Sequence, residues 1–267
     1  MRSKTAMKDN ALAIELWAIR KKWILRGLLV SLIGIVIAVG FVIYEPKLFS
    51  LAVYGAGLWT FLSVWDHAGM YAASAKPRRL SSGLRGENAV YDAASKLDSC
   101  VVRNQVLLPN ARSRTGHTEA DFIIIGKKAL YLIETKNNSG RVAVNDKGKE
   151  WKVTLAGGQK TTMRNPVRQV KIQAKVLRER LNEMGVSVAI KPAVAFPNID
   201  ARLFMTGPVS TPVFTYPLDN MTDWIQEQEE ESSAPVIDQA RMQGILDRLH
   251  SIAQHQSKLT SSKKGAY

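Results

Sequence analysis

Two carboxylates and a lysine stand at one end of a predicted β-hairpin. The segment EADFIIIG is followed, after a Lys-Lys pair, by the segment ALYLIETK. If residues 127–128 form a two-residue turn, Asp121 lies directly opposite Glu134. Side chains alternate across a strand, so Lys136 shares the face of Glu134. The hairpin therefore predicts that these three polar groups converge, whereas a three-residue turn would shift the pairing by one position.

Such a cluster is suited to a hard divalent cation. Two carboxylates in contact repel each other unless one is protonated or a cation lies between them. Carboxylate oxygens suit Mg²⁺ or Mn²⁺, and the Thr135 carbonyl is a further candidate ligand beside Asp121 and Glu134. A lysine near the metal can orient a bound water for phosphodiester hydrolysis, which would be the role of Lys136. The simpler alternative is an ordinary Glu–Lys salt bridge on a strand.

A predicted helix over residues 85–97 supplies a further carboxylate. Its apolar residues recur at helical spacing, and Glu87, three residues before Val90, shares their inward face. Acidic residues near a helix N-terminus also interact favourably with the helix dipole. The pattern by itself leaves both the metal-ligand role and the capping role open for Glu87.

A long helix is predicted over residues 165–184, with Asn165 as the N-cap and a proline in the first turn. Gln169, near its start, could reach a metal site or a base. Basic residues that could contact a phosphate backbone repeat along the helix and also occupy a predicted loop: Arg168, Lys171, Lys175 and Arg178, with Arg112 and Arg114. For an isolated helix, a solvated basic face is the simpler interpretation.

The composition favours a polyanionic partner. The chain of 267 residues has a formal net charge of +14, which attracts nucleic acid or an acidic membrane surface. Residues 80–205 alone contain 21 Lys and Arg against 11 Asp and Glu, so the excess is not only membrane-flanking charge. The single cysteine, Cys100, excludes an internal disulfide and a cysteine-rich zinc site.

Two apolar runs near the N-terminus predict a transmembrane helical hairpin over residues 23–65. The first run, 23–44, is long enough to cross a bilayer, and the second, 48–65, carries no charge. Basic residues flank both outer ends, so both termini are predicted to lie on the cytoplasmic side of the membrane. The first run is too long for a signal peptide, and a buried soluble hairpin is disfavoured because core helices usually keep a polar face.

The region after the hairpin alternates helices with short strands. Strands are predicted at 101–108, 119–125, 129–136, 141–145, 151–155 and 187–196. Together with the two helices, they predict an α/β fold with a mixed sheet flanked by helices. Two further helical patterns, beginning at Met221 and Pro235, close the chain.

Five short motifs in this region resemble the NERD, or nuclease-related, domain. They are GEN (86–88), TEADFIII (118–125), LIETKN (132–137), Trp151 and NPVRQ (165–169). The resemblance covers about residues 83–197 and implies a restriction-endonuclease-like fold of the PD-(D/E)XK nuclease superfamily. One departure is Ala120, where many relatives have isoleucine.

The resemblance also implies roles for individual residues. Glu87 would correspond to the helix glutamate of the first motif, and Asp121 to the metal-binding aspartate. Glu134 and Lys136 would be the ExK pair, and Gln169 the glutamine of the helix after the sheet.

These observations predict a bacterial inner-membrane, multi-pass protein whose cytoplasmic domain is a nuclease that depends on Mg²⁺ or Mn²⁺, with DNA as the substrate. The predicted organisation is a cytoplasmic segment (1–22), a transmembrane hairpin (23–65), a juxtamembrane linker (66–82), a nuclease-like domain (83–200), a C-terminal extension with helices (201–256) and a disordered tail (257–267). The alternatives are a membrane-tethered nucleic-acid-binding or scaffold module without efficient catalysis, and a basic domain that docks on anionic lipid. Protein partners, including a homo-oligomer, stay open.

Overall fold

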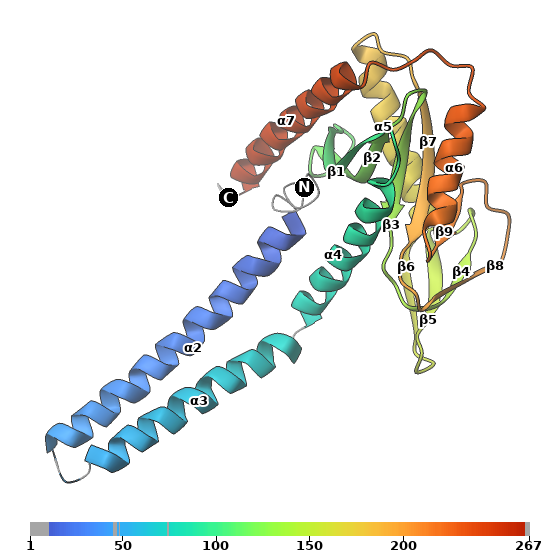
Figure 1. The fold of residues 1–267 in the computed structure, drawn as a ribbon. Helices are drawn as coiled ribbons and strands as arrows, with labels where there is room; N and C mark the ends of the chain where they lie inside the picture. The colour runs from blue at the N-terminus through green and yellow to red at the C-terminus, as the bar shows by residue number, and fades with distance from the viewer. Residues whose placement is uncertain (1–10, 45–46, 48, 74, 265–267) are drawn as a thin grey trace. The chain divides into compact units, whose positions relative to one another are not determined.

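The structure, a computed structural model, describes residues 11–44, 47, 49–73 and 75–264. The chain divides into two compact units, Met1–Leu84 and Arg85–Tyr267. The first unit contains helices α2 (Ala11–Tyr44) and α3 (Phe49–Ala73) and the beginning of α4 (Ala75–Ala94). The second unit contains the remainder of α4, two β-sheets and three further helices (Figure 1).

Helices α2 and α3 pack closely against each other. The Trp59 ring of α3 lies over Gly34 of α2, where a Cβ atom would be 2.1 Å from the ring. The indole Nε1 of Trp59 donates a hydrogen bond to the Val30 carbonyl at 3.2 Å. Most of the large apolar side chains of both helices are nevertheless exposed. The two predicted apolar helices are therefore present and pair with each other.

Only one of the two predicted spans has the properties of a membrane-spanning helix within the described residues. The helix over Leu12–Tyr44 has a window of mean hydropathy 2.6, and 12% of that window is buried. Helix α3 is not among the candidate spans within the described residues. The prediction of two transmembrane helices is therefore supported for the first helix alone. Residues 45–46 and 48, which were predicted to link the two helices and to begin the second span, lie outside the described residues.

The second unit is built on two sheets. The larger has the strand order β1-β2-β3-β7-β9, and the smaller has the order β6-β5-β4-β8. The strands are β1 (Val101–Pro109), β2 (His117–Ile125), β3 (Ala129–Thr135), β4 (Gly140–Val144), β5 (Glu150–Thr154), β6 (Lys160–Arg164), β7 (Ala189–Phe196), β8 (Ala201–Met205) and β9 (Val213–Thr215). Strands β1, β2 and β3 pair antiparallel, whereas β3, β7 and β9 pair parallel. The predicted mixed α/β architecture is thus present, with two sheets.

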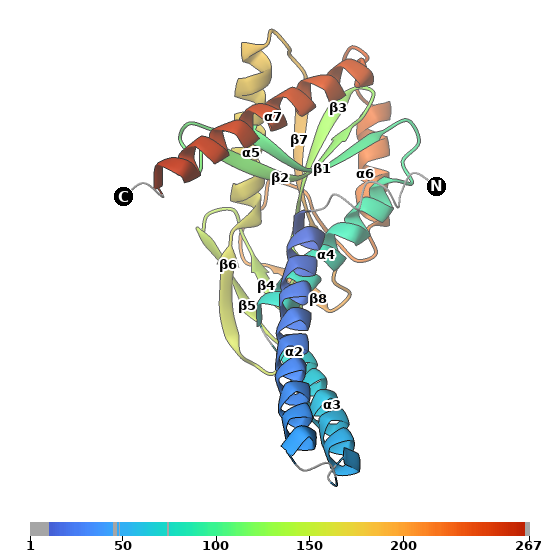
Figure 2. The same cartoon turned by 90° about the vertical axis from the view of Figure 1, so that its left-hand side faces the viewer.

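Helices cover both faces of the larger sheet. One face packs on α5 (Pro166–Glu183) and α7 (Gln239–Lys264), and this core extends to the smaller sheet through Trp151 and Val153. The other face packs on the end of α4 and on α6 (Asp219–Glu230). Strand β7 lies between α5 and α6 (Figure 1), and α7 crosses β1 and β2 (Figure 2). Strand β3 is therefore central, with Leu130, Tyr131, Leu132 and Ile133 almost fully buried.

The register predicted for the β2–β3 hairpin is confirmed. Phe122 pairs with Ile133 and Ile125 with Leu130, and the Gly126 amide donates to the Ala129 carbonyl at 3.0 Å. Continuing this register by one step places Asp121 opposite Glu134. A two-residue turn at 127–128 therefore sets the position of the polar cluster.

Two segments are more helical than the sequence predicted. The predicted linker 66–82 is helical at residues 66–73 and 75–82. Residues 257–264, which lie in the segment predicted as a disordered tail, extend α7. This stretch contains neither glycine nor proline, so nothing in it interrupts a helix before Gly265.

Candidate active site

The centre of the candidate site is Glu134, a carboxylate near the end of the buried strand β3. Its exposed fraction is 0%, and the strand carries it on the face that packs on α5. The Lys136 ammonium forms an ion pair with Oε1 of Glu134. The same ammonium donates to Oε1 of Gln169, in the first turn of α5, at 3.4 Å. A buried carboxylate requires such partners, because an unpaired charge in the protein interior is costly.

Gln173, one turn after Gln169, binds the other oxygen of Glu134. Its Nε2 donates to Oε2 of Glu134 at 2.9 Å and to the Glu119 carbonyl at 2.7 Å. The side chain is 1% exposed, and its Oε1 atom is buried without a hydrogen-bond partner. Sequence reasoning did not assign Gln173 to the site, although its spacing of four residues from Gln169 was a usable signal.

Asp121 lies beside this pair in a crowded anionic environment. The Thr135 amide donates to Oδ2 of Asp121 at 2.8 Å, which ties the carboxylate to β3. Burial and the negative charges of Glu134 and Glu87 raise the pKa of Asp121 well above its usual value, against the opposing effects of the Thr135 amide and Lys136. The structure therefore brings Asp121, Glu134 and Lys136 together as the hairpin predicted, and a cation at this point would relieve the repulsion.

A backbone irregularity accompanies Asp121. The β1–β2 register places Gln105 opposite Asp121, and Gln105 has a left-handed φ of 50°. Ala120 faces the α5 core, and so does Ile123, whereas Phe122 faces the opposite core. The strict alternation of the strand is thus broken at Asp121. The irregularity was not visible in the sequence, because glutamine is not a residue that favours positive φ.

Glu87 approaches the site from α4 and contacts it through Gln105. Nε2 of Gln105 donates to Oε2 of Glu87 at 3.0 Å. The preceding residue, Gly86, is required by close approach: a Cβ atom there would lie 2.7 Å from the Cβ of Asn137. Glycine at this position therefore lets α4 approach Asn137, which follows Lys136 just after the end of β3.

The fit to a divalent cation is partial. Asp121 and Glu134 supply the hard oxygen donors that Mg²⁺ and Mn²⁺ prefer, and the Thr135 carbonyl belongs to the same strand end. Across residues 11–44, 49–73 and 75–264, however, no group of three or more His, Cys, Asp or Glu side chains is arranged to hold a metal ion. The negative charge of Glu87 helps to raise the pKa of Asp121, but Glu87 does not form a three-residue metal-binding group with Asp121 and Glu134. A site here would take two carboxylates and complete its coordination with water.

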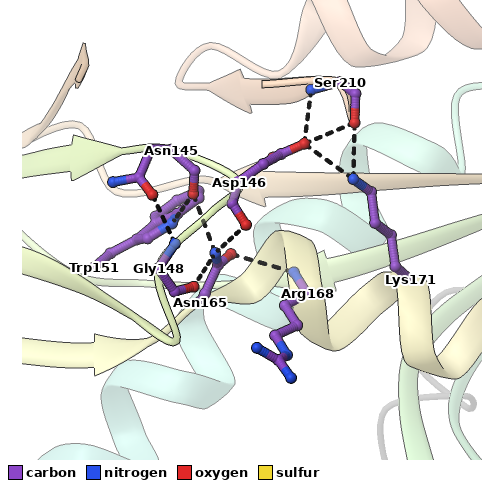
Figure 3. A network of polar contacts seen from close by, with 8 residues as sticks. All are labelled: Asn145, Asp146, Gly148, Trp151, Asn165, Arg168, Lys171 and Ser210. Atoms are coloured by element: carbon purple, nitrogen blue, oxygen red, sulfur yellow. Dashed lines mark hydrogen bonds and ion pairs between the residues drawn. The ribbon is translucent and has the colours of Figure 1, made fainter. Parts of the chain in front are cut away.

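A second polar network fixes the start of α5 (Figure 3). Asn165 is 2% exposed, and its Oδ1 accepts from the Arg168 amide at 3.2 Å as the predicted N-cap. Its Nδ2 donates to the Asn145 carbonyl at 3.1 Å and to the Gly148 carbonyl at 2.8 Å. Nε1 of Trp151 also donates to the Asn145 carbonyl, at 2.7 Å. Trp151 and Asn165 therefore join the β4–β5 turn to α5 and so position Gln169 and Gln173.

Replacing Asn165 by alanine is expected to destabilise the protein by about 2–4 kcal/mol, because the helix loses its cap and the Gly148 carbonyl loses its partner. Thermal unfolding of the full chain in detergent, followed by circular dichroism, would measure the change. Asn182→Ala, at an exposed position of the last turn of α5, is the matched control and should have little effect. Equal unfolding temperatures for the two variants would contradict the assigned role.

The predicted basic stripe lies on the exposed side of α5. Arg168, Lys171, Lys175 and Arg178 are all exposed. Lys171 is partly neutralised, because its ammonium lies 3.0 Å from Oδ2 of Asp146 and donates to Oγ of Ser210 at 2.7 Å (Figure 3). In the turn between β1 and β2, Arg112 lies 3.4 Å from Glu179 of α5, and Arg114 is exposed in the same turn. The stripe is thus accessible; Lys171 has an acidic partner, and so does Arg112 in the neighbouring turn.

Comparison with known proteins agrees with this geometry. No curated protein and no solved structure gives a significant match to the chain. The family model described as "Nuclease-related domain" (NERD) matches residues 82–197. That range begins within α4, before Glu87, and ends one residue after β7, so it includes every candidate catalytic residue. Residues 82–197 of this chain are therefore a NERD, or nuclease-related, domain.

Proposed function

We propose that this protein is a membrane-anchored nuclease that hydrolyses phosphodiester bonds of DNA in a metal-dependent reaction. The observation that carries the proposal is the fully buried Glu134, held between Lys136 and Gln173 and adjacent to Asp121, within a nuclease-related domain. A protein core gains little from two close carboxylates, since the desolvation of each is unfavourable. A metal-binding role in catalysis explains the presence of these two carboxylates better than a structural role does.

The residues around Glu134 would have different roles in the reaction. Asp121 and Glu134, with the Thr135 carbonyl, would hold Mg²⁺ or Mn²⁺, which when bound would stabilise negative charge on the scissile phosphate and acidify a water molecule. Lys136 would orient the attacking water as an ammonium, and only its neutral amine form could accept the proton of that water. Gln169 accepts from the Lys136 ammonium and would fix its direction. Glu87 would orient Asp121 or bind metal-bound water.

The membrane anchor would be α2, whose apolar span is the one described above. The basic residues at its start and after α3 favour a topology with both ends on the cytoplasmic side of a bacterial inner membrane. In this multi-pass arrangement α3 would return the chain through the bilayer as the less apolar partner of α2. The nuclease-related domain would then act on cytoplasmic nucleic acid.

A cleavage assay on the full chain in detergent tests the proposal. Supercoiled plasmid DNA and an RNA of similar length would be incubated with Mg²⁺, Mn²⁺ or Ca²⁺, or with EDTA. We expect cleavage of DNA with Mg²⁺ or Mn²⁺ and none with EDTA, because two carboxylates must be neutralised before a phosphate can approach. Cleavage that persists in EDTA would contradict the metal role, and RNA cleaved in preference to DNA would contradict the substrate.

One observation favours a second candidate, a tethered nucleic-acid-binding module without efficient catalysis. Both oxygens of Glu134 already have protein partners, Lys136 and Gln173, and within the described part of the chain no third acidic, His or Cys ligand joins the two carboxylates. This candidate predicts salt-sensitive DNA binding with no turnover under any of the metal conditions.

A further inference from the structure

The outer face of the smaller sheet carries a concentration of positive charge. The inner face of this sheet is apolar, with Val142, Trp151 and Val153 in the core. Alternation therefore turns the intervening side chains to solvent. The basic sheet face, as we call this surface, comprises five exposed residues from all four strands: Arg141, Lys152, Lys160, Arg164 and Arg202.

The register places these residues beside one another without matching acids. Arg141 of β4 is the partner of Arg202 of β8, so two guanidinium groups share one face at adjacent positions. Thr154 separates Arg141 from Lys160 in the same cross-strand row. The one acidic residue on this face of the four strands is Glu150, opposite Arg164. Like charges on neighbouring strands destabilise a sheet, so its stability does not account for this arrangement.

An exposed aromatic ring lies within the basic sheet face. Phe204 of β8 is 40% exposed, and the Arg141 guanidinium lies 5.2 Å from the centre of its ring. This cation–π contact orders the Arg141 side chain over the ring, and the guanidinium offers several N–H donors. A planar donor fixed in this way is suited to bind a phosphate through two oxygens.

The basic sheet face is directly connected to the candidate active site by the chain. Strand β4 begins four residues after Lys136, and β6 ends at Arg164, one residue before the Asn165 cap of α5. Arg164 lies four residues before Arg168, the first residue of the basic stripe on α5, and the extended Asn165 lies between the strand and the helix. The network of Asn165 and Trp151 fixes this junction (Figure 3). The two positive surfaces are thus linked through the chain at the start of α5.

We propose that the basic sheet face binds the sugar–phosphate backbone of the nucleic acid next to the scissile bond. This inference rests on the proposed function, because it assumes that the ligand of the domain is nucleic acid. A positive sheet face with Glu150 as its one acidic residue, an exposed aromatic ring and a short chain connection to the candidate active site all favour a nucleic-acid backbone over a lipid surface. The sheet would position the substrate, while the residues around Glu134 would cut it.

The salt dependence of binding tests the proposal. The full chain in neutral nanodiscs would bind a fluorescent DNA duplex in EDTA, which prevents metal-dependent turnover, over a range of KCl concentrations. Removing one cation that neutralises a DNA phosphate should reduce the slope of log K against log salt by about 0.9. We expect Lys152→Gln with Lys160→Gln to reduce the slope by about 2, since two such cations are removed. The matched control, Arg241→Gln with Arg248→Gln on exposed positions of α7, should leave it unchanged.

Three results would overturn the inference. One is an unchanged slope for the sheet variant when a variant of the α5 stripe does lower it, and this result leaves the proposed function standing. Another is an equal reduction in the control, which would show a general charge effect. The third is unchanged DNA binding together with loss of attachment to phosphatidylserine vesicles, which would assign the face to lipid. If the unmodified chain cleaves no DNA, the proposed function fails independently of these slopes.

Discussion

DNA cleavage by the full chain is expected to fall at least 10²-fold when Lys136 is replaced by methionine, the loss typical of removing a positioned proton-transfer group. Methionine keeps most of the length and the apolar stem of lysine but has neither charge nor donor. The substitution removes the cation from Oε1 of Glu134 and the donor from Oε1 of Gln169. The readout is the initial rate of plasmid cleavage with Mg²⁺, at saturating DNA.

Loss of folding must be separated from loss of chemistry in this variant. Because Glu134 is buried, removing its cation also costs stability. Lys191→Met is the matched control: Lys191 lies on the neighbouring strand β7, is partly buried, and donates to Oε1 of Gln228 at 2.6 Å. Both variants should keep native circular dichroism, and only Lys136→Met should lose activity. Undiminished cleavage by Lys136→Met would remove this lysine from the mechanism.

Asp121→Asn is expected to abolish metal-dependent cleavage and, at neutral pH without metal, to make the protein more stable. The carboxyl of Asp121 has a raised pKa because of burial and of the nearby negative charges of Glu134 and Glu87. An acid with a raised pKa in the folded state stabilises folding below its unfolded pKa, and this benefit is lost as the pH rises through the folded pKa. Asparagine can still accept from the Thr135 amide, but it carries no charge.

Thermal unfolding with and without Mg²⁺ would measure this trade-off. We expect the unfolding temperature of Asp121→Asn in EDTA to exceed that of the unmodified chain by about 2–4 °C, which corresponds to roughly 1 kcal/mol in a protein of this size. Mg²⁺ should stabilise the unmodified chain, since a ligand that binds the folded state favours it, and should leave the variant unaffected. A variant that is less stable at neutral pH would show that Asp121 has a structural role instead.

The hairpin and the long helix could be predicted because local chemistry determines them. Two mainly apolar strands joined by a Lys-Lys pair can pair in only a few registers. Burial of one face of the hairpin then selects one of these registers. Asn165 followed by proline is an equally local signal, and α5 begins at Pro166. The proximity of Asp121, Glu134 and Lys136 to one another follows from the hairpin, and the position of Gln169 beside them follows from the helix.

Other parts of the site depend on interactions between distant segments and were missed for that reason. Gln173 is a site residue only because α5 packs on the face of β3 that carries Glu134. The left-handed Gln105 is held by its place opposite Asp121 and by its bond to Glu87, not by its own preference. The exact position of the short strand β8 could not be predicted, because β8 depends on β4 as its parallel partner. Periodicity within one segment contains no information about such pairings.

The strands and helices that follow residue 197 belong to the same sheets and cores as the residues before it. Strands β8 and β9 complete the two sheets, and the cores include Met221, Ile225 and Leu246 from the last two helices. The Glu229 carboxylate of α6 accepts hydrogen bonds from the amides of Lys127 and Lys128, which form the turn that sets the hairpin register. The segment that matches the family is therefore shorter than the segment that stabilises its fold. The family match ends at residue 197, whereas part of the free energy that keeps the β2–β3 hairpin in register comes from α6, after that residue. Sequence divergence in that C-terminal region would alter the nuclease-related site without changing any residue by which the family is recognised.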